Sequence, residues 1–553
     1  MNRNIVGIIK SKLNKKKTII MAIYSCLMAI AIVLERKIIF TGEVGASYEQ
    51  NIFLPFEIKD VLKFLIAFIL IYIISLGIVI IFDNKKFSII STRKKEHNRK
   101  SNFKFWMIFT VITIICWMPF FLTYAPGSVL GDSTASIDQG LDFSQLNNHH
   151  PVLYSVFVGI FMRIGRAFNN YNLGVALYSF TQLTIMAGIV GYSMMWLKKK
   201  NVSLIYIILS WLYFVTTTLF VKYAIIMWKD PLFCSFLFLM TLMLFDIIKS
   251  NGEMLKNKLN IIKFIILSIL IAFFRNNGFL IVVCIYLTLL IMYRRKTLKF
   301  DIIALTTIIL IAIVQGPVYK KLNINSPFEE AVAIPLQQIA RTVAYDGEIS
   351  DEQKEFLNKL YPEEDFKTTY TPMIVDTVKW NKNFSKTFLY DNKVGFFKTW
   401  AQMLIPNFGT YVEAYLMETL GFWSTHIQNW YGFADTYIIW EKADIENQYD
   451  IHRVDLIQKY LGFSMENKFI EPIPIGSGTL FWIMLFIIAI LIANRKSKYI
   501  FTFLPGILTW ITIMISTPVA FSLRYVFIFA YTLPIMLAIP FIVKAQEEDI
   551  IRK

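Results

Sequence analysis

The chain has 553 residues, of which 56% are hydrophobic and 17% are charged. Soluble globular proteins carry about 25% charged residues, so this composition excludes a soluble enzyme, a disordered protein and a fibrous protein. The net charge is +17, but residues 316–475 carry 15 basic and 22 acidic side chains, a net of −7. A basic membrane part with an acidic insertion explains this distribution without nucleic acid as a partner.

Apolar runs that approach the roughly 20 residues needed to cross a lipid bilayer recur along the chain. They predict an all-α polytopic membrane protein with about twelve spans, near residues 18–34, 61–82, 105–124, 172–197, 203–222, 231–248, 262–274, 279–293, 301–315, 478–494, 500–516 and 526–543. Basic loops favour the cytoplasmic side, and the loop at 83–104 carries eight Lys and Arg side chains. We therefore expect a multi-pass protein of the cell membrane with both termini in the cytoplasm.

Residues 151–166 form a short apolar segment that contains Arg163 and ends in Arg166. If this segment crossed the membrane, the basic triplet 198–200 would move outside, so we predict a juxtamembrane or re-entrant helix on the outer side. The hairpin formed by 262–274 and 279–293 has arms too short for a full crossing. Its tip at Arg275 would then lie at membrane depth, where charged side chains usually face the interior of a bundle.

These features divide the chain into four parts. Residues 1–104 form a two-span extension with a basic cytoplasmic loop. Residues 105–315 form a transmembrane core whose outer loop, 125–150, carries candidate catalytic residues. Residues 316–477 form a mostly helical extracytoplasmic domain with five tryptophans, and residues 478–553 form the last spans and the tail.

Five polar groups stand out, and the predicted topology puts all of them on the outer side: Asp132; His149 and His150; Lys229 and Asp230; Arg275 and Asn276; Arg524 and Tyr525. Each group has a structural alternative. These are, in order, a helix cap, histidines at a loop end, an ion pair at a helix start, a polar hairpin turn and a snorkelling anchor. Gln338 and Arg341 are further polar candidates on a predicted helix of the outer domain.

Together the groups place acids in an outer cavity with cations near the same membrane level. The planar fork of arginine pairs well with phosphate, and a carboxylate can orient and deprotonate a hydroxyl group. The pattern therefore predicts a site for a substrate that carries a phosphate at the membrane surface. Oxygen ligands also suit Mg²⁺ or Mn²⁺, which Asp132 and Asp230 would hold, although no dense carboxylate cluster requires a metal.

The order of these residues resembles that of the GT-C superfamily of membrane glycosyltransferases, including its protein O-mannosyltransferase and lipid A aminoarabinose transferase branches. The string N-N-H-H-P-V-L-Y-S-V-F-V-G-I-F-M-R-I-G at 147–165 is similar to the H-P-P-L-Y-Y-x-L…F-x-x-x-G segment of that superfamily, with Val152 in place of its second proline. K-D-P-L at 229–232 resembles its second acidic motif. F-R-N-N-G at 274–278 and S-L-R-Y at 522–525 resemble its later basic motifs. The resemblance covers roughly residues 100–315 and 478–545.

The resemblance implies a GT-C-like helical bundle that takes a sugar from a polyprenyl-phosphate carrier at the outer membrane face, usually with inversion at the anomeric carbon. Asp132, which lies where the superfamily carries its outer-loop carboxylate, would be the base, and Asp230 the second acid. Arg275 and Arg524 would hold the donor phosphate, with His150 and Lys229 as further candidates. His149, Asn276, Tyr525, Gln338 and Arg341 would contact substrate. The acceptor would be an extracytoplasmic glycan such as a cell-wall polymer, a lipid or a protein.

Two other functions also fit an outer cavity lined by cations. A polysaccharide polymerase or ligase uses a lipid-linked donor and outer arginines as well. A transporter of lipid-linked glycans would usually show pseudo-symmetric halves with matching broken helices, and the sequence has no such halves. We therefore expect a glycosyltransferase, with the polymerase or ligase and the transporter as alternatives.

Overall fold

A computed structural model describes residues 14–41, 49–84, 88–91, 98–294, 297–425, 449–466, 468–469 and 476–551. The described chain is almost entirely helical. Its sheet is one antiparallel pair, β1 (Ile38–Ile39) and β2 (Ile52–Phe53). The predicted all-α architecture is therefore confirmed. Trp430 and Trp440, two of the five tryptophans counted in the outer region, lie outside the described residues.

The helices fall into three groups along the chain. The first group precedes the outer region: α2 (Lys15–Glu35), α3 (Ile58–Asp83), α4 (Arg99–Thr123), α5 (Gly131–Leu141), η2 (Phe143–Gln145), α6 (Val152–Ala167), α7 (Tyr171–Lys199), α8 (Leu204–Thr216), α9 (Thr218–Ile225), α10 (Lys229–Lys249), η3 (Glu253–Lys256), α11 (Lys258–Phe274), α12 (Gly278–Tyr293), α13 (Leu298–Ile313), η4 (Val314–Val318) and α14 (Tyr319–Lys321). The second group holds the short helices η5 (Phe328–Glu330), α15 (Ala333–Ala344), α16 (Asp351–Leu360), α17 (Glu363–Thr369), α18 (Asp376–Lys379), α19 (Lys386–Asp391), α20 (Lys393–Leu404), α21 (Phe408–Glu418), α22 (Leu420–Trp423) and α25 (Leu456–Leu461). The third group is α26 (Ser477–Ala493), η6 (Ser497–Phe503), α27 (Leu504–Ser516), η7 (Leu523–Val526) and α28 (Ile528–Ile551).

Eight helical segments among the described residues are long and apolar enough to cross a membrane. They are Lys15–Glu35, Ile58–Asp83, Arg99–Thr123, Tyr171–Lys199, Lys229–Lys249, Leu298–Lys321, Ser497–Ser516 and Ile528–Ala545. Helices α8 and α9 meet at a 55° bend and form a broken span or a re-entrant loop, which raises the number to at most nine. Each of the twelve predicted runs contains helix, but α11, α12 and α26 have only 16 or 17 residues. The structure thus supports a membrane protein with several spans, and the number twelve stays a prediction.

Helix α10 lies at the centre of the bundle and α3 at its edge. Of the most apolar part of α10, 89% is buried, against 11% for α3. Helix α10 packs against α7, α11 and α28, whereas α3 exposes Ile66, Ile73 and other large apolar side chains along its length. Apolar side chains exposed around a long helix are stable in contact with lipid, so the edge helices present a lipid-facing surface and α10 organises the interior.

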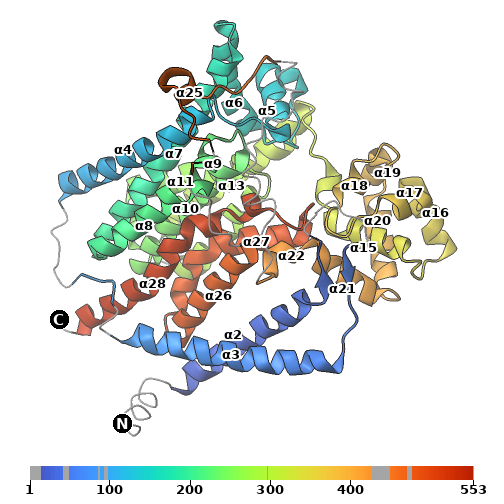
Figure 1. Cartoon of the computed structure of the whole chain (residues 1–553), viewed down its shortest axis with the longest axis horizontal. Coiled ribbons are helices and arrows are strands. Elements are labelled where there is room, and N and C mark those ends of the chain that lie inside the picture. The colour runs from blue at the N-terminus through green and yellow to red at the C-terminus, as the bar shows by residue number, and fades with distance from the viewer. Residues whose placement is uncertain are drawn as a thin grey trace.

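The short helices α15–α21 gather on the opposite side of the bundle from the end of α28 (Figure 1). They surround a core of their own, in which Leu336, Tyr361 and Tyr411 are almost completely buried. Beyond this core, Leu420, Phe422 and Trp423 pack into the apolar core of the bundle instead. The predicted outer domain therefore contains one independent core, between about residues 328 and 411, and its later part is attached to the membrane helices.

Helix α6 is held between α5 and α7 by close glycine contacts. A Cβ atom added to Gly159 would lie 2.4 Å from the Gly140 carbonyl oxygen, and one added to Gly165 would lie 2.8 Å from the Asn170 carbonyl oxygen. Helix α6 has 16 residues and is not among the candidate spans. It stands upright at the top of Figure 1, where α3 and α4 run across the view. Its predicted juxtamembrane position agrees with this arrangement, and the side on which it lies remains a prediction.

We expect Gly159→Ala to destabilise the protein, because its methyl group cannot fit without separating α5 from α6. Overpacking a close contact costs about 1–3 kcal/mol. Thermal unfolding of the purified protein in detergent should show a lower midpoint for this variant. Gly188→Ala in α7 is the matched control, since nothing lies within 4 Å of a Cβ atom there. Equal midpoints for Gly159→Ala and the wild type would contradict the assigned packing.

Candidate functional site

Hydrogen bonds between two distant loops bring Asp132 beside Lys229. Ser128 N donates to Ile225 O at 2.9 Å, and Met227 N donates to Ser128 O at 2.8 Å. One helical turn further, Ser133 Oγ donates to Met227 O at 2.7 Å. These bonds fix the start of α5 against the start of α10, so that the carboxylate in the first turn of one helix faces the ammonium group in the first turn of the other.

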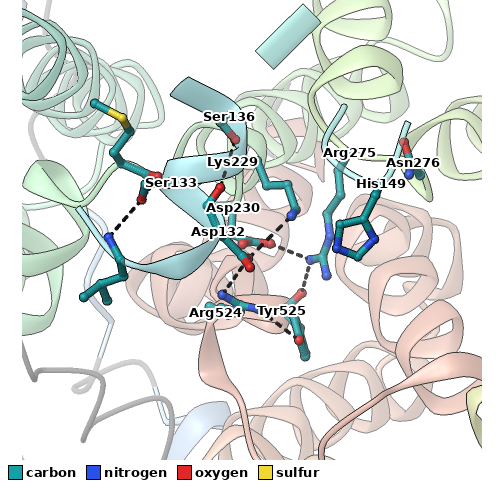
Figure 2. Close-up of polar contacts among 12 residues, drawn as sticks. Asp132, Ser133, Ser136, His149, Lys229, Asp230, Arg275, Asn276, Arg524 and Tyr525 are labelled. Atoms are coloured by element: carbon teal, nitrogen blue, oxygen red, sulfur yellow. Dashed lines mark hydrogen bonds and ion pairs between the residues drawn. The ribbon is translucent and has the colours of Figure 1, made fainter. Parts of the chain in front are cut away.

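Asp132 pairs with two cations that belong to separate parts of the chain. Arg524 Nη1 donates to its Oδ2 at 3.1 Å, and Lys229 Nζ lies 3.6 Å from the same oxygen (Figure 2). Burial raises the pKa of the Asp132 carboxyl, but the charges of Lys229 and Arg524 outweigh burial and hold that pKa well below its usual range. Asp132 is therefore ionised at neutral pH in this arrangement.

A second ion pair lies beside the first. Asp230 is completely buried, and Arg275 Nη1 lies 2.9 Å from its Oδ1. Tyr525 joins the two pairs, because its ring centroid lies 4.8 Å from the Arg275 guanidinium carbon and 4.9 Å from that of Arg524. Arg275 also donates to the Tyr525 carbonyl oxygen at 3.4 Å, and Arg524 donates to the Tyr525 hydroxyl at 3.2 Å. The structure thus brings six of the sequence-predicted residues into one cluster.

This cluster forms one wall of a cavity of about 670 Å³. Asp132, Lys229, Arg275, Arg524 and Tyr525 all line it. The opposite wall comes from the outer helices and contains Glu330, Asp376, Lys379 and Trp380. Lys379 is almost fully buried and pairs with Glu330 at 2.9 Å and with Asp376 at 2.8 Å. Small-molecule sites typically enclose about 300–1,000 Å³, so the space is large enough for a small-molecule ligand.

Sequence reasoning missed this opposite wall. Glu330, Asp376 and Lys379 show no motif or periodicity in an acidic region of many charges, and only the tryptophan content of the region pointed to Trp380. The outer region is joined to the loop at residues 125–150 through Asn148, whose N–H donates to Asn325 O at 2.8 Å. Asn276 Nδ2 in turn donates to Asn148 O at 2.6 Å. Three loops far apart in the sequence therefore meet at one residue.

The two histidines differ in position, because His149 lines this cavity whereas His150 is buried and does not line it. His149 lines the cavity, and its Nδ1 is 3.8 Å from Glu330 Oε1. Burial, followed by the charge of Lys229, lowers the pKa of His150 to about 3. A neutral imidazole can still donate one hydrogen bond, so His150 suits a hydroxyl oxygen as a polar partner and does not supply charge to the predicted phosphate site.

Gln338 and Arg341, which the sequence analysis placed in contact with substrate, do not reach this cavity. Both are buried on α15, in the core of the outer helices. Arg341 Nη2 donates to Glu413 at 2.6 Å, and Gln338 accepts from Trp400 Nε1 at 2.8 Å. Their polar groups form hydrogen bonds inside the domain, because a buried polar group is costly without a hydrogen-bond partner. The amphipathic pattern of α15 did not reveal that its polar positions also face inward.

The acids of the site are a poor fit for a divalent ion. No group of three or more His, Cys, Asp or Glu side chains among the described residues is arranged to hold a metal. Asp132 and Asp230 each face a guanidinium group, and a metal would have to replace those cations.

We predict that acid lowers the stability of the protein through His150. A free histidine has a pKa of about 6.5, whereas that of folded His150 is about 3. Between these two pKa values the unfolded chain therefore binds a proton at His150 and the folded chain does not. The contribution of His150 to the free energy of unfolding is complete above pH 6.5 and is lost as the pH falls through 6.5 toward 3. At pH 5 the loss is about 2 kcal/mol.

Thermal unfolding at pH 7.5 and pH 5 checks this expectation. The midpoint should fall less for His150→Gln than for the wild type. His452→Gln is the control, since His452 is exposed on the outer surface and should leave the full pH dependence in place. An equal fall for His150→Gln and the wild type would assign the titration to another group.

One protein family, described as "Family of unknown function (DUF6020)", matches residues 142–550. The matched range contains both basic motifs and the outer helices, whereas Asp132 lies just before it. No curated protein and no solved structure matches the chain. Because the match extends over well more than half of the chain, the protein belongs to the DUF6020 family, which is described as a family of unknown function.

Proposed function

We propose that this protein is an integral-membrane glycosyltransferase that moves a sugar from a polyprenyl-phosphate donor to an extracytoplasmic acceptor. One observation carries the proposal: Asp132 and three cations, Lys229, Arg275 and Arg524, line one cavity between membrane-type helices and a cap of outer helices. Cations in this arrangement suit a phosphate, and the carboxylate among them suits a reacting hydroxyl.

A lipid-linked donor is favoured over a water-soluble one by the position of the cavity. Its wall includes Thr512, Ile513 and Ser516 of α27. Ile515 of the same helix does not line the cavity and is 61% exposed. An isoprenyl chain could therefore lie along the apolar surface of α27 while its phosphate enters the cavity, since burial of each CH₂ group contributes about 0.8 kcal/mol.

The low pKa of Asp132 suggests how the donor activates the acceptor. A carboxylate held by two cations is ionised but is a weak base, and general bases act best when their pKa lies near the working pH. A donor phosphate that binds Arg524 and Lys229 would take these cations from Asp132. The pKa of Asp132 would then rise, and the carboxylate would become a stronger base at the moment when the donor is in place.

The transfer then balances without a further reactant. The acceptor hydroxyl oxygen attacks the anomeric carbon, and the bond from that carbon to the phosphate oxygen breaks with inversion. Asp132 receives the hydroxyl proton, and the polyprenyl phosphate leaves with the bonding electron pair. Arg275 and Arg524 stabilise the negative charge on the leaving phosphate. Fixed donors of this kind are worth about 3–4 kcal/mol each in a transition state.

Transfer assays with membranes that contain the protein test the proposal. The donors are synthetic polyprenyl-phosphate hexoses labelled in the sugar, incubated with crude cell-surface glycan, lipid and protein fractions. Movement of label to one of these fractions supports the proposal. Lengthening of a glycan on the lipid carrier would indicate a polymerase, and uptake of the intact donor into vesicles without bond cleavage would indicate a transporter.

We expect Asp132→Asn to lower turnover by about 10²-fold or more, the usual loss for a general base. The variant should still insert and purify like the wild type, because an amide can accept the Arg524 hydrogen bond. Asp142→Asn is the matched control, an exposed acid of the same loop that caps η2. Near-normal turnover of Asp132→Asn would remove it from the chemistry.

Arg524→Ala is expected to weaken donor-phosphate binding. A hydrogen bond to a charged group is worth about 1.5–3 kcal/mol, so affinity for geranylgeranyl monophosphate should fall about tenfold or more. Binding to the purified protein is measured by thermophoresis, with geranylgeraniol as the ligand that lacks phosphate. Arg166→Ala, an exposed cation at the end of α6, should bind like the wild type. Unchanged affinity of Arg524→Ala would exclude Arg524 from the phosphate site.

A further inference from the structure

A second cavity adjoins the cationic one. It encloses about 620 Å³ and lies under the outer helices. The two cavities share His149, Ser326, Pro327 and Trp380 in their walls. Trp380 is 49% exposed and lines both cavities, so its side chain lies between them. A molecule in the second cavity would lie directly beside a phosphate held by the first.

The second cavity differs from the first in its charge. Two of its lining residues carry formal charges, Glu329 and Lys386, and these pair with each other at 3.3 Å. The low pKa of His150, which also lines it, keeps that side chain neutral. Uncharged hydrogen-bonding groups supply the rest of the polar surface: Asn147, Asn325, Ser326, Thr387 and Tyr390. This lining suits a neutral ligand that is rich in hydroxyl groups.

Aromatic rings complete the lining. Trp380 and Tyr390 are about half exposed. Lys386 Nζ lies 3.6 Å from the centroid of the Trp380 ring, and Lys393 Nζ lies 3.7 Å from that of Tyr390. These cation–π contacts, with Lys379 and His149 also against Trp380, hold each ring in place, and about half of each side chain stays exposed. The C–H face of a sugar ring packs against an aromatic surface, while its hydroxyl groups reach the neighbouring amides.

We propose that the second cavity binds an uncharged sugar unit of the acceptor, which makes the acceptor a glycan. Trp380 would then separate the acceptor sugar from the donor phosphate, with His149 at the junction. The role of this sugar as the acceptor rests on the proposed function, whereas the sugar site itself follows from the lining of the second cavity.

A defined glycan array tests this site with the full-length protein in detergent. The array holds neutral oligosaccharides of glucose, galactose, mannose and N-acetylglucosamine, together with uronic-acid glycans, poly(glycerol phosphate) and peptides. The key variant combines Tyr390→Ala with Thr387→Val, since both residues line only the second cavity and are exposed. Trp380→Ala is a second variant, and Tyr460→Ala, an exposed aromatic residue on α25, is the control.

We expect the wild type to bind neutral glycans and the double variant to bind them about tenfold more weakly, a loss of about 1.4 kcal/mol. Trp380→Ala should lose binding as well, and Tyr460→Ala should keep it. The double variant should bind geranylgeranyl monophosphate like the wild type, which shows that it is folded and that the first cavity is intact.

Failure of the wild type to bind any neutral glycan, or binding only to anionic glycans or peptides, would overturn the inference. So would equal glycan affinity for the wild type and the double variant. The wild type could instead bind neutral glycans through Tyr390 and fail to bind geranylgeranyl monophosphate. That result would overturn the proposed donor and leave the sugar site supported.

Discussion

Asp230 lies fully buried at the first turn of the central helix α10, and the Arg275 guanidinium 2.9 Å away compensates its charge. Burying a charge is costly unless an opposite charge and hydrogen bonds accompany it. This requirement fixes the turn after α11 against α10 and places η7 beside both, since Arg275 and Arg524 both pack against the same Tyr525 ring. The elements that carry the candidate site are therefore positioned by the need to neutralise buried charge.

The same compensation leaves the site ready for an anion. Removing one partner of a buried pair is strongly unfavourable, but an incoming phosphate exchanges one anionic partner for another. The cations on the bundle side and the acid pairs around Lys379 on the outer side then form two walls of different chemistry. Trp380 marks where the cationic cavity meets the neutral one. The proposed charged donor and neutral acceptor sugar would each have a cavity of matching chemistry.

The position of Asp132 depends on contacts far from its own loop. Helix α5 has only 11 residues and carries few apolar side chains of its own, so its stability depends on neighbours. The glycine contact with α6 and the hydrogen bond from Ser133 to Met227 supply them. Backbone hydrogen bonds to the loop before α10 complete the attachment. A short helix held in this way can carry a charged residue at a defined position, although no bilayer-length apolar segment supports it.

Composition and local pattern determined the helical membrane class, because long apolar runs have few stable alternatives in a bilayer. They also identified Asp132, Lys229, Asp230, Arg275 and Arg524, since isolated charges beside apolar runs are conspicuous. The number of spans was harder to predict, because α11, α12 and α26 have intermediate lengths. Gln338 and Arg341 were misplaced, and Glu330, Asp376 and Lys379 were missed. Their surroundings depend on how the outer helices pack together, and that packing joins residues distant in sequence. Tertiary structure alone decided which polar side chains face a cavity and which satisfy a buried partner.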